Sequence, residues 1–222
     1  IIEAITDATD PLNIVYQDSL AIYLGDITSG TLTFNRTKMY FPVTMDGVSP
    51  GNMQIAFAPD GQIGYMVGTG RIDSTAYPKK ANNLLYVKTT DGGLTWGPPQ
   101  EFYFADDTAV TNNIGDSLAI DNIASAGGDV DIVVDSLGNP HTLFNIDWRP
   151  NSDFGFVWTF PPSTMWHVYS PDGGVNWEMN RVSTTDLKYG GIGEVGNDVY
   201  QENRPQLSRD ENGRYILMAW FD

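Results

Sequence analysis

The chain lacks cysteine and is poor in basic residues. Its 222 residues include 12 Lys and Arg against 28 Asp and Glu, which gives a formal net charge of −16 at pH 7. So acidic a surface repels nucleic-acid phosphates and anionic membrane surfaces, and we therefore expect no nucleic-acid partner. Without cysteine the chain can form neither disulfides nor thiolate metal sites, although this absence does not decide the cellular compartment.

Long hydrophobic runs and helical periodicity are also absent. No apolar run approaches the roughly 18 residues of a membrane-spanning helix, so we expect no membrane insertion. The first residues, Ile1 to Ala4, lack the basic start of a secretory signal. Apolar residues nowhere keep a helical spacing for long, and a short helix within Ile114 to Ala124 is the most helix that we expect.

Aspartate, glycine and aromatic residues are abundant. Of the 28 acidic residues 22 are Asp, which favours turns because the short carboxylate accepts hydrogen bonds from nearby backbone N–H groups. The 6 Trp, 11 Tyr and 10 Phe, within 41% apolar residues, are enough to build a sizeable core. We therefore expect a turn-rich, all-β protein.

An eight-residue turn occurs twice. The two octets are Thr89-Thr90-Asp91-Gly92-Gly93-Leu94-Thr95-Trp96 and Ser170-Pro171-Asp172-Gly173-Gly174-Val175-Asn176-Trp177. Each follows a strand-like run, Leu84 to Lys88 or Met165 to Tyr169. Two copies that each follow a strand indicate a structural repeat.

A hairpin centred on a glycine occurs three times, at Gly61, Gly138 and Gly213. Hairpins and octets both recur at about 75 to 81 residues, in the order hairpin, long loop, strand, octet, strand. Each unit therefore has four strands, as a propeller blade has. The period is longer than that of a compact blade, so the excess must lie in loops.

The octets resemble the Asp box, the S-x-D-x-G-x-T-W turn of bacterial neuraminidase repeats, which sialidases share with several other propeller families. The matching positions are Thr89 and Ser170 (hydroxyl), Asp91 and Asp172 (carboxylate), Gly93 and Gly174 (glycine), and Trp96 and Trp177 (indole). The one departure is Asn176, where the motif has Thr. The resemblance implies a β-propeller of four-stranded antiparallel blades, boxes that serve as scaffold, and a bacterial protein that is extracellular or at the cell surface.

We expect a single propeller segment over residues 1–222. A partial blade spans 1–51, complete blades span 52–128 and 129–203, and the first half of a further blade spans 204–222. Closed propellers need at least about four blades. We therefore expect the remaining blades to come from the same longer chain or from an associated chain.

The expected site lies on the face opposite the Asp boxes, where the long connections gather. Near the start of each inner strand two polar residues alternate with apolar ones. These are Asn52 and Gln54, Asp129 and Asp131, and Arg204 and Gln206. They are expected to rim the central channel, either as a binding site or as its wet entrance.

Sialidases are similar in clamping a carboxylate with three arginines, and they pair a Tyr nucleophile with a Glu and use an Asp as acid and base. The arginines of the expected site face are Arg71, Arg149 and Arg204, and Tyr200 with Glu202 is a candidate pair, as is Tyr189 with Glu194. The Arg-Ile-Pro signature is absent, because nothing separates Arg204 from Pro205. Solvated loop charges are the simpler interpretation.

Other candidate groups are weaker. Trp148 and Trp158 lie in an aromatic-rich stretch that is either a sugar or peptide platform or packing for its own loop. Asp-rich loops leave calcium open, although no EF-hand spacing occurs and we expect no other metal or cofactor. His141 and His167 lie far apart in separate strands and offer little for a metal cluster.

The function that we expect is a carbohydrate- or protein-binding module or a scaffold, with a glycan or a protein as its ligand. The alternative is a glycoside hydrolase of the exo-sialidase kind. A spacer between other domains is a third interpretation, because the fold alone does not decide function.

Overall fold

The computed structural model describes most of the strand-forming part of the chain. The described residues are 4–6, 14–16, 19–27, 30–40, 51–70, 82–104, 107–108, 110, 122–150, 160–183 and 204–220. They are mostly β-strands in antiparallel sheets, which confirms the all-β prediction. In this part of the chain no helix has the length and hydropathy needed to cross a bilayer.

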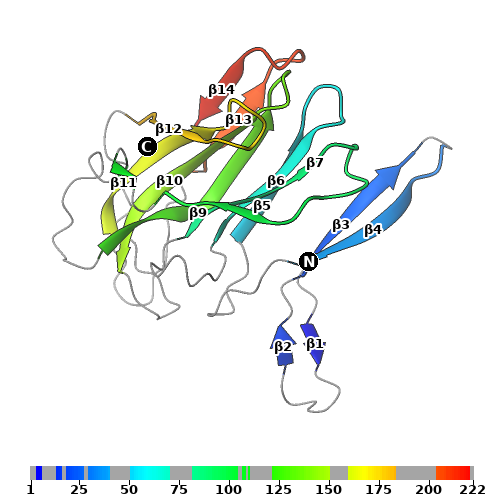
Figure 1. Cartoon of the computed structure of the whole chain (residues 1–222), viewed down its shortest axis with the longest axis horizontal. Helices are drawn as coiled ribbons and strands as arrows, with labels where there is room; N and C mark the ends of the chain where they lie inside the picture. The colour runs from blue at the N-terminus through cyan, green and yellow to red at the C-terminus, as the bar shows by residue number, and fades with distance from the viewer. Residues whose placement is uncertain are drawn as a thin grey trace.

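Two four-stranded antiparallel sheets form the centre of the molecule (Figure 1). The first meander consists of β5 (Gly51–Phe57), β6 (Gly64–Gly70), β7 (Asn83–Thr89) and β8 (Gln100–Phe102). The second meander consists of β9 (Asn122–Val134), β10 (Pro140–Pro150), β11 (Phe160–Tyr169) and β12 (Glu178–Arg181). In both, the strands pair in chain order and the octet joins the third strand to the fourth, as predicted.

Only the end of Ile114 to Ala124, the range where we allowed a short helix, is among the described residues. This end, Asn122 to Ala124, begins the long strand β9 instead. The partners Pro150, Arg149 and Trp148 on β10 hold these residues in an extended ladder, so tertiary pairing sets their conformation. The rest of that range lies outside the described residues.

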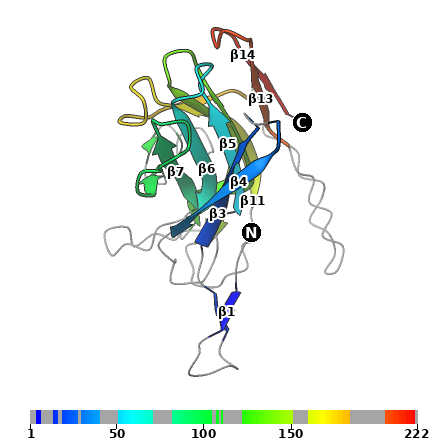
Figure 2. The same cartoon turned by 90° about the vertical axis from the view of Figure 1, so that its right-hand side faces the viewer.

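Three two-stranded hairpins complete the described structure. β1 (Ala4–Thr6) pairs with β2 (Ile14–Tyr16), β3 (Ser19–Asp26) with β4 (Thr33–Tyr40), and β13 (Gln206–Arg209) with β14 (Ile216–Ala219). The β3–β4 hairpin lies against the first meander, and the β13–β14 hairpin lies along the second (Figure 2).

The predicted turn glycines Gly61, Gly138 and Gly213 have φ angles of 71°, 81° and 66°, which suit glycine alone. Their turns also pack together. A Cβ at Gly138 would meet Ile63 at 2.6 Å, and the N–H of Ser136 donates to the Gly213 carbonyl at 3.2 Å. The first hairpin turns of successive units therefore meet at one end of the molecule.

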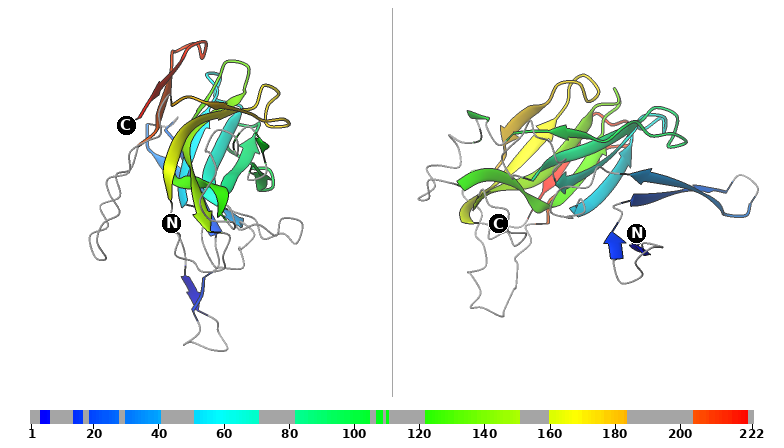
Figure 3. Two further views of the ribbon diagram at one scale, coloured as in Figure 1. Left: turned by 90° about the vertical axis from the view of Figure 1, so that its left-hand side faces the viewer. Right: turned by 60° about the horizontal axis from the view of Figure 1, so that its bottom comes forward.

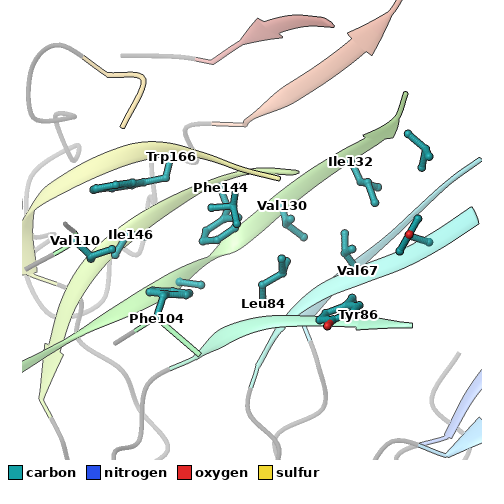
Figure 4. Packing of buried hydrophobic residues seen from close by; sticks show 14 of the residues in the cluster. Val67, Leu84, Tyr86, Phe104, Val110, Val130, Ile132, Phe144, Ile146 and Trp166 are labelled. Carbon is teal, nitrogen blue, oxygen red and sulfur yellow. The ribbon is translucent and has the colours of Figure 1, made fainter. Parts of the chain in front are cut away.

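The main core lies between the two meanders (Figure 4). Val67 and Leu84 of the first meander face Val130, Phe144 and Trp166 of the second, and all of them are buried. Every residue of β6 is buried, because this strand is covered on both faces. Because successive side chains of β6 point to opposite faces, Tyr65 and Val67 belong to the core between the meanders and Met66 belongs to a cluster on the outer face.

Smaller clusters cover the outer faces of the two meanders. On the first, Met66 and Val87 pack with Ile22 of β3. On the second, Leu143 and Met165 pack with Leu207, Met218 and Trp220 of the C-terminal hairpin. The four sheets form a row in which neighbouring sheets pack in chain order, and Figure 3 shows the first meander between the β3–β4 hairpin and the second meander. The C-terminal hairpin also contacts the first meander, since Arg209 Nη2 donates to the Phe57 carbonyl at 3.2 Å. Along this row the first strands are neighbours, since β9 contacts both β5 and β13.

Candidate functional site

The first octet is a turn closed by its own side chains. The Thr89 hydroxyl donates to Asp91 Oδ1 at 2.8 Å and accepts from the Gly93 N–H at 3.0 Å. Asp91 in turn accepts from the Thr95 N–H at 2.9 Å and from the Thr95 hydroxyl at 2.6 Å. The hydrogen bonds from Thr95, with one from Thr89, lower the pKa of Asp91 to about 2. The carboxylate is therefore ionised at neutral pH and engaged within its turn.

The second octet repeats this network with different side chains. Ser170 donates to Asp172 Oδ1 at 2.9 Å and accepts from the Gly174 N–H at 2.7 Å. Asn176 supplies both donors that Thr95 supplies in the first octet, its backbone N–H and its side-chain Nδ2. These hydrogen bonds from Asn176 lower the pKa of Asp172. Asn176, which stands where the Asp-box pattern has Thr, therefore makes the same two hydrogen bonds to the aspartate.

The octet tryptophans pack on aromatic rings. Trp96 meets Phe57 edge to face, with ring centroids 6.2 Å apart. Trp177 belongs to the second meander but lies against Tyr86 and Phe102 of the first, at 4.9 and 5.8 Å. The second octet is therefore anchored on the preceding sheet.

Polar side chains of the first meander also hold the second octet. The Tyr65 hydroxyl and Lys88 Nζ both donate to the Gly173 carbonyl, at 2.7 and 2.8 Å, and the Tyr86 hydroxyl donates to the Gly174 carbonyl at 3.1 Å. Burial raises the pKa of Tyr65 well above its usual value, so the hydroxyl keeps its proton. A cleft of about 430 Å³ opens beside these contacts, lined by Lys88, Pro98 and Gln100 among others.

The inner-strand rim, which we define as Gln54, Asp129, Asp131, Arg204 and Gln206, lies on the three neighbouring first strands or just before them. Gln54 and Gln206 are exposed. Asp131 instead joins two strands, since its carboxylate accepts from the Ile132 N–H at 2.8 Å and from the Leu207 N–H at 2.6 Å. At least one predicted rim residue therefore ties β9 to β13.

Arg204 has a backbone conformation that side chains rarely adopt. Its φ is 44°, and among the described residues no other non-glycine residue has a positive φ. Arg204 is exposed and directly precedes the buried Pro205. Strained backbone of this kind persists only where the surrounding structure holds it in place, and it is found most often at binding and catalytic sites.

A polar pair that the sequence did not reveal lies on β10. Asn145 Nδ2 donates to both carboxylate oxygens of Asp147 at 3.2 Å, and Asp147 is only 2% exposed. Opposite Asn145 the strand β9 bulges over residues 127–129. A Cβ at Gly127 would overlap the Asn145 amide, so the bulge needs glycine there. The Gly127-Gly128 step and the Asn-x-Asp spacing were the available signals.

The two histidines, which we expected to lie far apart, are neighbours. The register of β10 against β11 sets His141 beside His167, and Nδ1 of the former lies 3.0 Å from Nε2 of the latter. The rings of His141, His167 and Tyr169 are parallel to one another within 6°, with centroids 5.2 to 5.4 Å apart. Burial lowers the pKa of the His141 imidazole, although the neighbouring Asp135 carboxylate partly raises it. Burial, together with the neighbouring His141, lowers the pKa of His167 to about 4. In the described part of the chain no three His, Asp or Glu side chains form a group that could hold a metal ion.

Several predicted residues are not placed. Arg71, Trp158, Tyr200 and Glu202 lie outside the described residues. For Asn52, Trp148 and Arg149 only the backbone is described, with Arg149 opposite Ile123 and Trp148 opposite Ala124 near the far end of β10. The structure therefore places the rim residue Asp131 against strand β13. The clamp of three arginines (Arg71, Arg149 and Arg204) and the aromatic platform (Trp148 and Trp158) stay predictions.

No protein-family model matches the chain, and no curated protein sequence is significantly similar to it.

Proposed function

We propose that the chain is part of an Asp-box β-propeller and works as a carbohydrate-binding module. The observation that carries this proposal is the repeated octet network, in which Asp91 and Asp172 make the same hydrogen bonds in two four-stranded meanders. The neighbouring first strands and the stacked hairpin turns support an arrangement of units around an axis. An extracellular or cell-surface location belongs to the same proposal.

The inner-strand rim is the proposed sugar site. Exposed amides such as those of Gln54 and Gln206 both donate and accept hydrogen bonds, which matches the hydroxyl groups of a glycan. The exposed Arg204 adds a cation that suits an acidic sugar. Its strained backbone supports a functional role at this position, since such strain has to be maintained by the fold.

A glycan array probed with the 222-residue chain tests the proposal. We expect binding to a defined set of glycans that falls at least about tenfold, or about 1.4 kcal/mol, in Arg204→Gly. Glycine accepts a φ of 44° without strain, so this variant removes the guanidinium and leaves the turn intact.

Arg214→Gly is the matched control, because it removes the same charge from an exposed position at the other end of the same hairpin. Equal losses in both variants would mean a general charge effect, and no binding by the wild type to any glycan would reject the carbohydrate ligand. Binding to a protein partner that Arg204→Gly abolishes would move the same rim to a protein ligand.

A glycoside hydrolase of the exo-sialidase kind is the second candidate. The buried Asp147, held by Asn145 on the sheet face that also carries Leu143, favours it, because a catalytic acid needs a sheltered carboxyl. A fluorogenic sialoside is the substrate to use. Release of the fluorophore that Asp147→Asn abolishes would support the enzyme, and no release by the wild type would reject it.

A further inference from the structure

The cleft beside the second octet has the size of a ligand site. It opens between the first meander and the second octet and holds about 430 Å³, which falls within the range of small-molecule sites. One wall comes from β7 and from the residues that lead into β8, and the other wall is the Gly173–Val175 stretch of the octet turn. None of the inner-strand rim residues lines it, so the cleft is a separate place on the molecule.

The charge of this cleft is opposite to that of the protein. The chain has 28 Asp and Glu against 12 Lys and Arg, yet among the described residues that line the cleft Lys88 alone is charged. Asp172 belongs to the neighbouring turn but does not line the cleft, and its oxygens accept from Ser170 and Asn176. Because the net charge of −16 repels anions from most of the surface, a cleft lined by a cation alone favours an anionic group.

Lys88 keeps donors for such a group. Its Nζ donates to the Gly173 carbonyl at 2.8 Å and lies 5.5 Å from the centre of the Tyr65 ring. These two contacts hold the ammonium in place, so that little side-chain freedom is lost when a ligand binds. An ammonium carries three N–H donors, and in the described part of the chain Lys88 makes no ion pair. A ligand carboxylate would therefore gain a charge-assisted hydrogen bond.

The uncharged lining suits a hydroxylated ring. Gln100 is exposed, and its amide both donates and accepts hydrogen bonds, as sugar hydroxyl groups do. Pro98 is exposed on the same wall and Val175 is 76% exposed on the other, so both walls offer apolar surface to the C–H groups of a ring. A free amino acid fits less well, because its ammonium group needs a carboxylate that this lining does not offer.

We propose that the cleft binds an acidic sugar residue. Its carboxylate binds Lys88 Nζ, its hydroxyl groups bind the Gln100 amide, and its ring lies between Pro98 and Val175. The proposal stands on the cleft and does not require the inner-strand rim to bind a glycan.

An NMR titration of the 222-residue chain with glucuronate is the first test, and glucose is the neutral ring for comparison. We expect a Kd of about 1 mM for glucuronate, as is usual for so small a ligand, and binding at least about tenfold weaker for glucose. Lys88→Met should remove the preference for glucuronate, because only the carboxylate needs the cation. Lys88→Arg, which keeps the charge, should retain the preference and controls for the bond to Gly173.

Val175→Asp and Leu94→Asp form a matched pair for the second test. The two residues have the same position in the two octets and are 76% and 65% exposed, so neither change threatens the fold. Val175→Asp adds a carboxylate to the cleft and should weaken glucuronate binding at least about tenfold through repulsion of like charges. Leu94→Asp adds the same charge outside the cleft and should leave the binding unchanged.

The proposal is overturned if glucuronate does not bind the wild type, if glucose binds as well, or if Val175→Asp and Leu94→Asp bind glucuronate equally. Arg204→Gly separates this cleft from the inner-strand rim. Binding that is lost in Arg204→Gly and kept in Val175→Asp would support the rim and overturn the cleft. Binding that is lost in Val175→Asp and kept in Arg204→Gly would support the cleft, whatever the glycan array shows for the rim.

Discussion

Asn176 Nδ2 donates a hydrogen bond to Asp172 Oδ2, in the place where the Thr95 hydroxyl donates to Asp91 Oδ2. Two chemically different side chains therefore close the same turn. We expect Asn176→Thr to unfold at an unchanged urea concentration, because both residues supply the required donor. Asn176→Val, which has the shape of threonine without the hydroxyl, should unfold at a lower concentration. Equal midpoints for the Thr and Val variants would show that the side-chain donor is dispensable.

Gly127→Ala should destabilise the fold by about 1–3 kcal/mol, because the added methyl group overlaps the buried Asn145 amide. Chemical denaturation followed by tryptophan fluorescence measures the change. Gly97→Ala is the control, since a Cβ there would lie 3.4 Å from the nearest atom, the Lys88 carbonyl oxygen. The explanation fails if both variants lose the same stability.

Tyr65→Phe should cost about 1 kcal/mol, the net value of one hydrogen bond, because the Gly173 carbonyl loses a donor. Lys88 donates to the same carbonyl, so a double-mutant cycle of Tyr65→Phe with Lys88→Met should be non-additive by about 0.5 kcal/mol or more. Tyr215→Phe, at an exposed tyrosine, should change nothing. Strict additivity would mean that the two donors act on the octet independently.

Acid should destabilise the protein through His141 and His167. The folded pKa of His167 is about 4 and the ordinary value is 6.5, so between these values the unfolded chain binds more protons and stability falls as the pH falls. The expected loss between pH 7 and pH 5 is about 1–2 kcal/mol. It should be measured by urea unfolding at pH 7 and at pH 5. His141→Gln with His167→Gln should remove most of this slope, and an unchanged slope would place its origin elsewhere.

The octets and turn glycines were predictable because their chemistry is local. Asp91 finds all its donors within four residues, and Gly61 needs a positive φ whatever packs around it. Strand alternation was equally informative, since it predicted that Asp131 and its apolar neighbours lie on opposite faces of the strand, and the structure buries Ile132 in the core while Asp131 accepts from Leu207 of β13.

Contacts between distant segments were not predictable in the same way. His141 meets His167 only because of the register between β10 and β11, which depends on the chain that joins them. The bond from Leu207 to Asp131 spans 76 residues. Neither contact can be predicted from local residue patterns. Asp131, Gln54 and Gln206 occupy similar positions in the sequence, yet Asp131 bonds to β13 whereas the two glutamines are exposed.

The hydrogen bonds from Tyr65 and Lys88 to the Gly173 carbonyl join the two meanders. Because the turn of one meander is held by side chains of another, neither sheet can melt without releasing bonds in its neighbour. The described units should therefore unfold as one cooperative body rather than one by one, which distinguishes them from solenoid repeats that can fray from an end.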